Sequence, residues 1–397
     1  MTNNKKKILI LNGSHSEIPL IQAAKKMGFH VITTGNDPTL IGHSLSDEYH
    51  QSDFSNKYEI LELSKKLDID AVCSCANDFG AITASYVSEQ MGFSGHDSYE
   101  KTLILHHKDL FKEFAIKNNI ATPYAKGYNT VKEALNDVEN YTFPLIIKPI
   151  DLTGGKGVTK VLSKKEYKDA VEIAYNISPL KRFVVEEFFE GTQHSFSAFI
   201  VNKKVVFYFS DNEYSFLNPY LVSTSAAPAD NINRVSKALI ENSEIIIKEL
   251  ELVDGIFHIQ YLFDGKKAQI IEITRRCSGD LYPYPVNNST NIDWAEWIVK
   301  AEAGFDCFDF PEVKQNGFYG RHCIMANNNG VIKDIFFDDE IKQNIIDEII
   351  WWEKGDIIDN YKTYKAGIVF LKFENVNEMK EKTMIINDLI KIILNNK

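Results

Sequence analysis

The chain has 397 residues, a formal net charge of −11, 44% hydrophobic residues and 25% charged residues. This length predicts two or three domains, at roughly 150 residues per domain. The acidic balance argues against a dedicated nucleic-acid binder, and no apolar run approaches the roughly 18 residues of a membrane span, so we expect neither kind of partner.

The five cysteines favour a reducing compartment. Their number is odd and the chain is long, so a disulfide framework is not expected. Cys73 and Cys75 have no Cys/His pair at a suitable spacing after them, and we interpret them as buried thiols of a strand. A cytoplasmic location fits this use of cysteine.

Residues 7–95 alternate apolar strand patterns with amphipathic helical patterns. The segments are KILILN, EIPLIQAAKKMG, FHVITTG, YEILELSKKLD and DAVCSCA. This βαβαβ order predicts a parallel sheet with helices on its faces. The first turn, NGSHSE, lacks the G-x-G-x-x-G fingerprint, so we place no nucleotide there.

The middle of the chain has the pattern of a small α+β unit. Residues 104–120 predict one helix, and residues 124–209 predict strands and two helices that form a compact lid. Capping boxes at Thr130–Glu133 and Ser163–Glu166 mark the two helix starts.

A polar, aromatic loop at 211–230 precedes the remaining elements. A helix is expected over 233–249, followed by the strands GIFHIQYLF and KAQIIEIT and a helix near 292–303. Residues 311–397 predict a final α+β piece with strands near GRHCIMA and AGIVFLKF.

The stretch PLIIKPIDLTGGKGV at 144–158 combines a strand, a lysine and a glycine loop. The strand period turns Lys148 away from the face of Leu145 and Ile147, toward a cleft. Glycines in such a loop present N–H groups to phosphate oxygens and let it close over a ligand. A glycine-rich hairpin with surface lysines explains the stretch equally well.

Two further clusters carry polar chemistry. VVEEFFEG at 184–191 is suited to a hinge whose Glu186 accepts a hydrogen bond from an adenine amine, or to a plain strand end. In GIFHIQYLFDGKKAQIIEITRR, the strand period places Gln260 near Glu272 across a hairpin. Carboxylate and amide oxygens are hard ligands suited to Mg²⁺, and Arg276 is placed to bind a carboxylate substrate.

The order of these clusters resembles the ATP-grasp superfamily, in particular its carboxylate–amine ligases, which include biotin carboxylase, carbamoyl-phosphate synthetase and the purine-pathway synthetases. The resemblance covers nearly the whole chain. It implies an α/β and α+β fold: a parallel α/β pre-ATP-grasp domain (1–103), an ATP-grasp domain (104–310, lid about 124–209) and a small C-terminal α+β domain (311–397).

The resemblance also implies roles for individual residues. Those expected to bind ATP are Lys108, Lys148, Gly154, Gly155, Lys156, Gly157, Glu186, Glu187, Phe189 and His194. Those expected to hold Mg²⁺, or Mn²⁺ in its place, are Gln260, Glu272 and Thr274, while Arg275, Arg276 and His258 are expected near the substrate. Arg276 and Lys148 are the expected catalytic residues.

Three positions depart from the family pattern. His194 stands where a ribose-binding glutamate is common, Thr274 replaces a metal-binding asparagine and Arg275 replaces a proline. A threonine hydroxyl binds Mg²⁺ more weakly than an amide oxygen, so the sequence does not decide whether one or two metal ions bind.

The resemblance implies an Mg-ATP-dependent ligase that activates a small-molecule carboxylate as an acyl phosphate and joins it to an amine. The alternatives are an ATP-grasp small-molecule kinase, with a hydroxyl acceptor, and a non-catalytic ATP-binding module. The acid, the amine and the oligomeric state stay open, although homodimers are common in the family.

Overall fold

The computed structural model describes residues 5–152 and 154–395. Its amino-terminal unit is a parallel sheet in the order β3-β2-β1-β4. The elements are β1 (Lys7–Leu11), η1 (His15–Glu17), α1 (Ile18–Lys26), β2 (His30–Gly35), η2 (Ile41–Leu45), β3 (Glu48–Gln51), α2 (Lys57–Leu67), β4 (Ala71–Ser74) and α3 (Asp78–Met91). The predicted parallel sheet is confirmed, and the structure adds the edge strand β3, which the predicted βαβαβ order did not include.

Strand β1 shows why this sheet is covered on both faces. Ile8 and Ile10 join the apolar cluster that contains α1, whereas Leu9 and Leu11 join the cluster of α2 and α3. Successive side chains of a strand point to opposite faces, so a strand that is apolar throughout needs helices on both.

The single helix predicted over 104–120 is two helices in the structure, α4 (Tyr99–His106) and α5 (Lys108–Lys117). The helical conformation is interrupted at His107, whose backbone is extended. Tertiary contacts favour the break, because His106 is buried and its Nδ1 lies 3.1 Å from Asp78 Oδ1. The break makes Lys108 the first residue of α5.

The lid is a four-stranded sheet, β5-β8-β6-β7, covered by helices. Its elements are β5 (Ala125–Tyr128), α6 (Val131–Asn136), η3 (Val138–Asn140), β6 (Leu145–Pro149), β7 (Thr159–Val161), α7 (Lys164–Ile177) and β8 (Phe183–Glu187). Thr130 caps α6 as predicted, but the Ser163 hydroxyl does not cap α7, since Glu166 instead accepts from the Leu162 N–H.

The central body is an eight-stranded sheet in the order β13-β12-β9-β10-β11-β14-β18-β16. The elements of the body are β9 (Thr192–Val201), β10 (Lys204–Tyr214), β11 (Thr224–Ala227), α8 (Ile232–Glu249), β12 (Gly255–Phe263), β13 (Ala268–Thr274), α9 (Pro283–Thr290) and α10 (Trp294–Glu302). The predicted lid limit near residue 209 is therefore too late, because β9 pairs with β12 of the body and not with the lid sheet.

The carboxy-terminal piece continues the body sheet. Its elements are β14 (Phe318–Ile324), β15 (Gly330–Phe337), α11 (Asp339–Lys342), β16 (Ile345–Ile350), β17 (Ile357–Ile358), β18 (Gly367–Phe373), α12 (Val376–Met384), α13 (Ile386–Leu389) and β19 (Ile390–Leu394). Strands β14, β18 and β16 extend the eight-stranded sheet, and β17-β15-β19 form a small sheet beside it.

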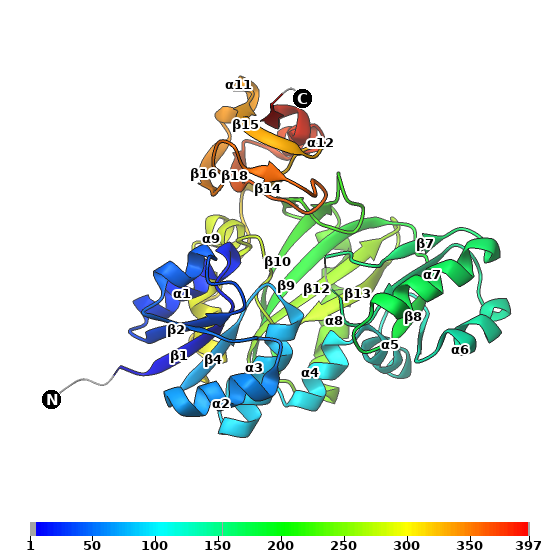
Figure 1. Ribbon diagram of the computed structural model, residues 1–397, viewed down its shortest axis with the longest axis horizontal. Helices are drawn as coiled ribbons and strands as arrows, with labels where there is room; N and C mark the ends of the chain where they lie inside the picture. The colour runs from blue at the N-terminus through cyan, green and yellow to red at the C-terminus, as the bar shows by residue number, and fades with distance from the viewer. Residues whose placement is uncertain (1–4, 153, 396–397) are drawn as a thin grey trace.

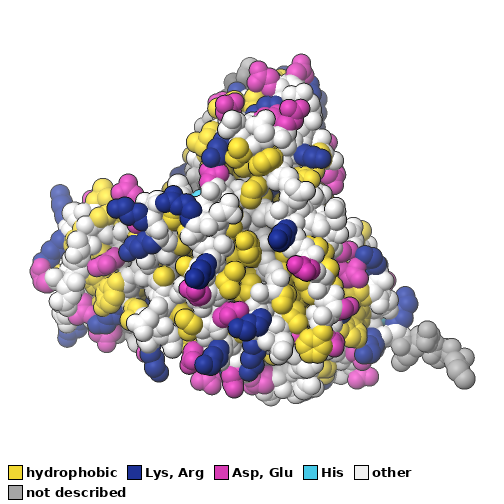
Figure 2. Space-filling view, turned by 180° about the vertical axis from the view of Figure 1, so that it is seen from behind, with side chains coloured by type: hydrophobic (Ala, Val, Ile, Leu, Met, Phe, Trp, Pro, Cys, Tyr) yellow, Lys and Arg dark blue, Asp and Glu magenta, His cyan; other side chains and the backbone are white. Residues whose placement is uncertain are grey.

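Figure 1 shows the amino-terminal unit, the lid and the carboxy-terminal piece standing around this central sheet. On the face drawn in Figure 2, basic and acidic side chains are interspersed. Among the described residues, no helix has the length and apolar character that crossing a membrane requires.

Candidate active site

A cavity of about 550 Å³ lies where the lid, the body sheet and both terminal units meet. This volume is within the range of small-molecule sites. The lid contributes Lys148 and the amino-terminal unit Asp78, while the carboxy-terminal piece contributes Arg321 and Lys365. Strands β12 and β13 supply one wall, so residues from all parts of the chain face one space.

Two lysines stand at the lid end of the cavity. Lys108, at the start of α5, has its Nζ 3.1 Å from the Leu152 carbonyl and 3.5 Å from Glu272 Oε1. Lys148 on β6 has its Nζ 3.2 Å from Glu186 Oε2. Both line the cavity, each as an ammonium group next to a carboxylate.

Glu186 is buried and paired with two cations. Its Oε2 lies 2.8 Å from Lys112 Nζ and 3.2 Å from Lys148 Nζ. Burial by itself would raise the pKa of Glu186, but Lys112 and then Lys148 outweigh it and lower that pKa. Burial also lowers the pKa of Lys112 to about 8. This ion pair joins α5 to the lid strand β8, a tie that the sequence patterns did not suggest.

Of the other residues predicted to bind the nucleotide near the hinge, only some line the cavity. Phe189 lines the cavity, whereas Glu187 is not among the residues that do. His194 is buried in the body, where its ring stacks on Tyr261 and its Nε2 lies 2.7 Å from Thr192 Oγ1. His194, predicted to bind the nucleotide, therefore does not line the cavity.

The glycine loop reaches the cavity through Gly154 and Gly155. Both have positive φ, 64° and 72°. A Cβ on Gly155 would lie 2.4 Å from Tyr220 Cβ, so the loop packs closely on the segment around Tyr220. Gly157 packs beside Ile177 of α7 instead, and Lys156 is exposed, so neither of these two residues lines the cavity.

The strand period places the predicted metal-binding residues together. Gln260 lies directly opposite Glu272 in the β12–β13 pair, and both line the cavity with Thr274. The Thr274 hydroxyl is buried without a hydrogen-bond partner among the described residues. A carboxylate, an amide oxygen and an unsatisfied hydroxyl fit Mg²⁺. Across the same residues, no three His, Cys, Asp or Glu side chains gather as a metal cluster.

His258 lies beside this group, opposite Thr274. Its Nδ1 is 2.5 Å from Ser197 Oγ. Burial, and then Arg276 and Arg321, lower the pKa of His258 to about 3. The imidazole is therefore neutral at physiological pH and lines the cavity as an uncharged group.

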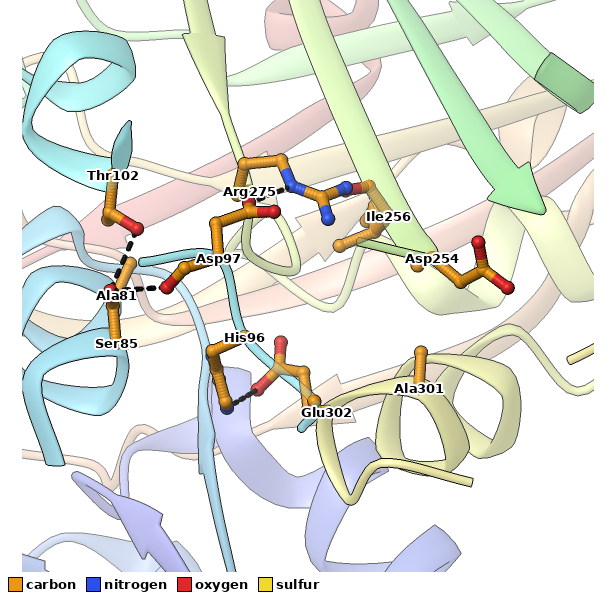
Figure 3. Close-up of a pocket in the computed structure, with 12 residues that line it drawn as sticks. Ala81, Ser85, His96, Asp97, Thr102, Asp254, Ile256, Arg275, Ala301 and Glu302 are labelled. Carbon is orange, nitrogen blue, oxygen red and sulfur yellow. Dashed lines mark hydrogen bonds and ion pairs between the residues drawn. The ribbon is translucent and has the colours of Figure 1, made fainter. Parts of the chain in front are cut away.

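Arg276 and Arg275 point in different directions. Arg276 lines the cavity and is held by Asp78, whose Oδ1 lies 3.1 Å from its Nε. Arg275 instead pairs with Asp97 at 2.7 Å (Figure 3). It also donates to backbone carbonyls, including that of Val253. Arg275, predicted to lie near the substrate, therefore does not line this cavity, because its guanidinium group is held by Asp97 and backbone carbonyls.

Asp78 also lines the cavity and was missed by sequence reasoning. It follows β4 of the parallel sheet, at the first position of α3. The carboxyl ends of parallel strands are the usual edge for ligands, so this position carried a usable signal.

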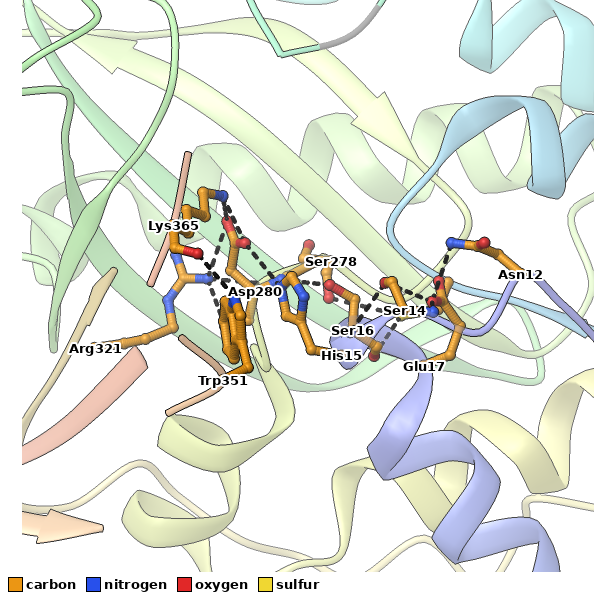
Figure 4. Close-up of polar contacts among 12 residues, drawn as sticks. Asn12, Ser14, His15, Ser16, Glu17, Ser278, Asp280, Arg321, Trp351 and Lys365 are labelled. Carbon is orange, nitrogen blue, oxygen red and sulfur yellow. Dashed lines mark hydrogen bonds and ion pairs between the residues drawn. The ribbon is translucent and has the colours of Figure 1, made fainter. Parts of the chain in front are cut away.

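A second missed group joins the three parts of the chain at the far end of the cavity. Asp280 accepts from Lys365 Nζ at 2.6 Å with both oxygens, and its carboxylate lies 3.6 Å from His15 Nε2 and 3.9 Å from Arg321 Nη1 (Figure 4). The His15 ring stacks on Trp351 at 4.3 Å between centroids. These contacts join residues from near both ends of the sequence, and no local pattern indicates them.

Glu213 on β10 is the third missed group. It is buried in the cavity wall and accepts from the side-chain amides of Gln193 and Gln260, each at 2.8 Å. Burial, and then Asp211, raise the pKa of Glu213 to about 7.

Comparison with known proteins agrees with this architecture. The family profile described as "Phosphoribosylglycinamide synthetase, ATP-grasp (A) domain" matches residues 106–217. The chain is 23% identical over 282 residues to the carbamoyl phosphate synthase large chain of Clostridium acetobutylicum, covering 65% of this chain. It spans about a quarter (24%) of the length of that relative.

Two solved structures cover nearly the whole chain. The L-amino acid ligase of Bacillus licheniformis superposes with a TM-score of 0.82 at 18% identity, covering 100% of both chains. The biotin carboxylase domain of Hydrogenobacter thermophilus 2-oxoglutarate carboxylase, a dimer in complex with MgADP, ADP and bicarbonate, gives 0.78 at 16% identity over 98% of this chain and 90% of that one.

These likenesses establish the predicted fold: a parallel α/β unit, an α+β lid and an antiparallel body with a carboxy-terminal extension. Residues 106–217 match an ATP-grasp family profile, and the whole chain has the fold of the two ligase structures with which it superposes.

Proposed function

We propose that this protein is an Mg-ATP-dependent ligase that joins a small-molecule carboxylate to an amine and releases ADP and phosphate. The observation that supports it most directly is that groups suited to phosphates, to Mg²⁺ and to a carboxylate all line the same cavity. Lys108 of α5, Lys148 of the lid and a glycine loop line one end, oxygen ligands line the wall, and guanidinium groups line the other end.

The nucleotide would bind between the lid and the body. Lys108 and Lys148 would contact its phosphates, with Gly154 and Gly155 above them. Phe189 would lie near the base. Glu186 is already paired with Lys112 and Lys148, so it would accept a hydrogen bond from an adenine amine while it keeps both ion pairs. The wall residues Gln260, Glu272 and Thr274 would hold Mg²⁺, which when bound neutralises charge on the phosphates.

The reaction needs positioning more than covalent help from the protein. A carboxylate oxygen of the substrate would form a bond to the γ-phosphorus while the bond to the β-phosphate oxygen breaks. The amine nitrogen would then attack the acyl carbon, and phosphate would leave. Arg276, fixed by Asp78, would hold the carboxylate in line, and closure of the lid would protect the acyl phosphate from water.

The proposal also covers the domain boundaries, the cellular location and the oligomeric state. We keep the division 1–103, 104–310 and 311–397, with the lid ending near residue 188. A cytoplasmic location is supported by five free, buried cysteines. The dimeric relative supports a homodimeric assembly.

The test is a screen of amino acids and small carboxylates, with amine acceptors, for release of ADP. Orthophosphate together with a new amide supports the ligase, whereas a phosphorylated hydroxyl acceptor indicates a kinase. Glu272→Ala is expected to lower turnover by about 100-fold or more, as for other groups that stabilise transferring charge. Full turnover in this variant would contradict the metal assignment.

A further inference from the structure

Glu213 has an unusual place for an acidic residue of a phosphate-binding cavity. Its side chain is buried in the wall, and across residues 5–152 and 154–395 no lysine, arginine or histidine forms an ion pair with its carboxylate. Every other carboxylate of the cavity lining has such a cation in that part of the chain: Asp78, Glu186, Glu272 and Asp280. The partners of Glu213 are two neutral amides.

These amides arrive from neighbouring strands. Gln193 lies on β9 and Gln260 on β12, and each donates its Nε2–H to Glu213 Oε2 at 2.8 Å. The sheet order is β13-β12-β9-β10, so Glu213 lies on one side of Gln260 and Glu272 lies on the other.

Glu213 accepts both hydrogen bonds through the same oxygen, Oε2, whereas a glutamine amide has a donating end and an accepting end. Gln260 must therefore turn its NH₂ group toward Glu213. Its oxygen is then left for the opposite side, where Glu272 stands across the hairpin.

We propose that Glu213 is a positioning residue that orients the Gln260 amide, so that its oxygen faces the divalent cation held with Glu272. The inference rests on the proposed Mg-ATP function. A cation is attracted by the amide oxygen and repelled by the NH₂ group, so a glutamine ligand needs a device that fixes its orientation. A glutamate at position 260 would not need one, because both of its oxygens can bind.

The first test compares the affinity for Mn²⁺ of the full-length protein and of Glu213→Gln. Manganese binding is followed by electron paramagnetic resonance with a non-hydrolysable ATP analogue present, so the readout is independent of turnover. A glutamine at 213 can donate as well as accept, and Gln260 is then free to flip. We expect the affinity for Mn²⁺ to fall about 10- to 100-fold, as for other groups that orient metal ligands.

Two double variants separate positioning from other roles. In Glu213→Gln/Gln260→Glu the oriented amide is no longer needed, and the affinity should return to within about threefold of wild type. In a Gln260→Leu background, Glu213→Gln should change the affinity by less than about twofold, because coupled residues are not additive. A further tenfold loss in that background would overturn the inference in favour of direct ligation by Glu213.

The surface variant Glu241→Gln on α8 serves as the control, with the affinity for the analogue without metal measured alongside. Equal Mn²⁺ affinity of Glu213→Gln and wild type overturns the inference and leaves the proposed function standing. Failure of the wild type to bind Mn²⁺ with the analogue overturns the proposed function itself. Loss in Glu213→Gln without recovery in the double variant that adds Gln260→Glu indicates a merely structural role and also overturns the inference.

Discussion

His322 shows how a single buried side chain contributes to the response of this protein to acid. It lies on β14 with Nδ1 2.7 Å from Thr224 Oγ1 and no described partner for Nε2. Burial, and then Arg321, lower the pKa of His322 from 6.5 to about 3. The unfolded chain takes up this proton near pH 6.5 and the folded chain does not, so its contribution to stability is present above pH 6.5 and is lost as the pH falls toward 3.

This sign gives a measurable prediction for His322→Asn, which removes the titrating group. Between pH 7.5 and 5.0 the free energy of unfolding of wild type should fall by about 2 kcal/mol more than that of the variant, since 1.5 pH units below the ordinary pKa correspond to this amount. Urea unfolding at the two pH values measures it. His194 and His258 titrate in both proteins and cancel, so parallel pH dependences would contradict a neutral His322.

At the scale of elements, the glycine loop between β6 and β7 packs closely against the segment around Tyr220. Gly154 and Gly155 both have positive φ, but a Cβ on Gly155 would meet the Tyr220 carbonyl at 2.8 Å, whereas one on Gly154 has its nearest neighbour, Leu221 Cδ1, at 3.9 Å. Gly155→Ala therefore combines backbone strain with a clash, and Gly154→Ala has the strain alone.

We expect Gly155→Ala to lower kcat/KM for ATP by about tenfold or more relative to Gly154→Ala, because small displacements of positioning groups are costly. Steady-state kinetics at varied ATP concentration provides the measurement, and the second alanine variant is the matched control. Equal values for the two variants would show that the contact with Tyr220 does not matter for nucleotide use.

At the scale of the whole molecule, Asp280 connects the body to both terminal units. Burial by itself would raise the pKa of Asp280, but Lys365, His15 and Arg321 outweigh it and hold that pKa well below its usual range. The carboxylate is charged at all ordinary pH values, and it compensates the cations that reach it from β14 and from the segment before β18.

Removing this charge should loosen the assembly of the three units. Asp280→Asn leaves Lys365 and Arg321 buried without their carboxylate, which typically costs about 3–5 kcal/mol. Urea unfolding should show this loss, while the exposed control Asp339→Asn should change stability by at most about 1 kcal/mol. If Asp280→Asn also changed the free energy of unfolding by at most about 1 kcal/mol, the three units would hold together without the Asp280 carboxylate.

The cavity residues differ in how far local patterns could locate them. Gln260 and Glu272 lie in one hairpin, so the period of two in the strands was sufficient to bring them together. The same period implied that Arg275 and Arg276 point apart, although both were expected at the substrate. The single helix predicted over 104–120 was wrong because the burial of His106 against Asp78 is a tertiary contact.

The sequence by itself determined the parallel amino-terminal sheet, the existence of a lid, the lysine and glycine stretch and the Glu272 hairpin. Each of these depends on residues close together in the chain, whose spacing reflects helical or strand periodicity. Only the tertiary structure decided where the lid ends, that β14, β18 and β16 extend the body sheet, and that Glu213, Asp78 and Asp280 belong to the cavity. Those features arise from strand pairings and ion pairs between distant segments, and no local spacing encodes which distant partner a buried charge will meet.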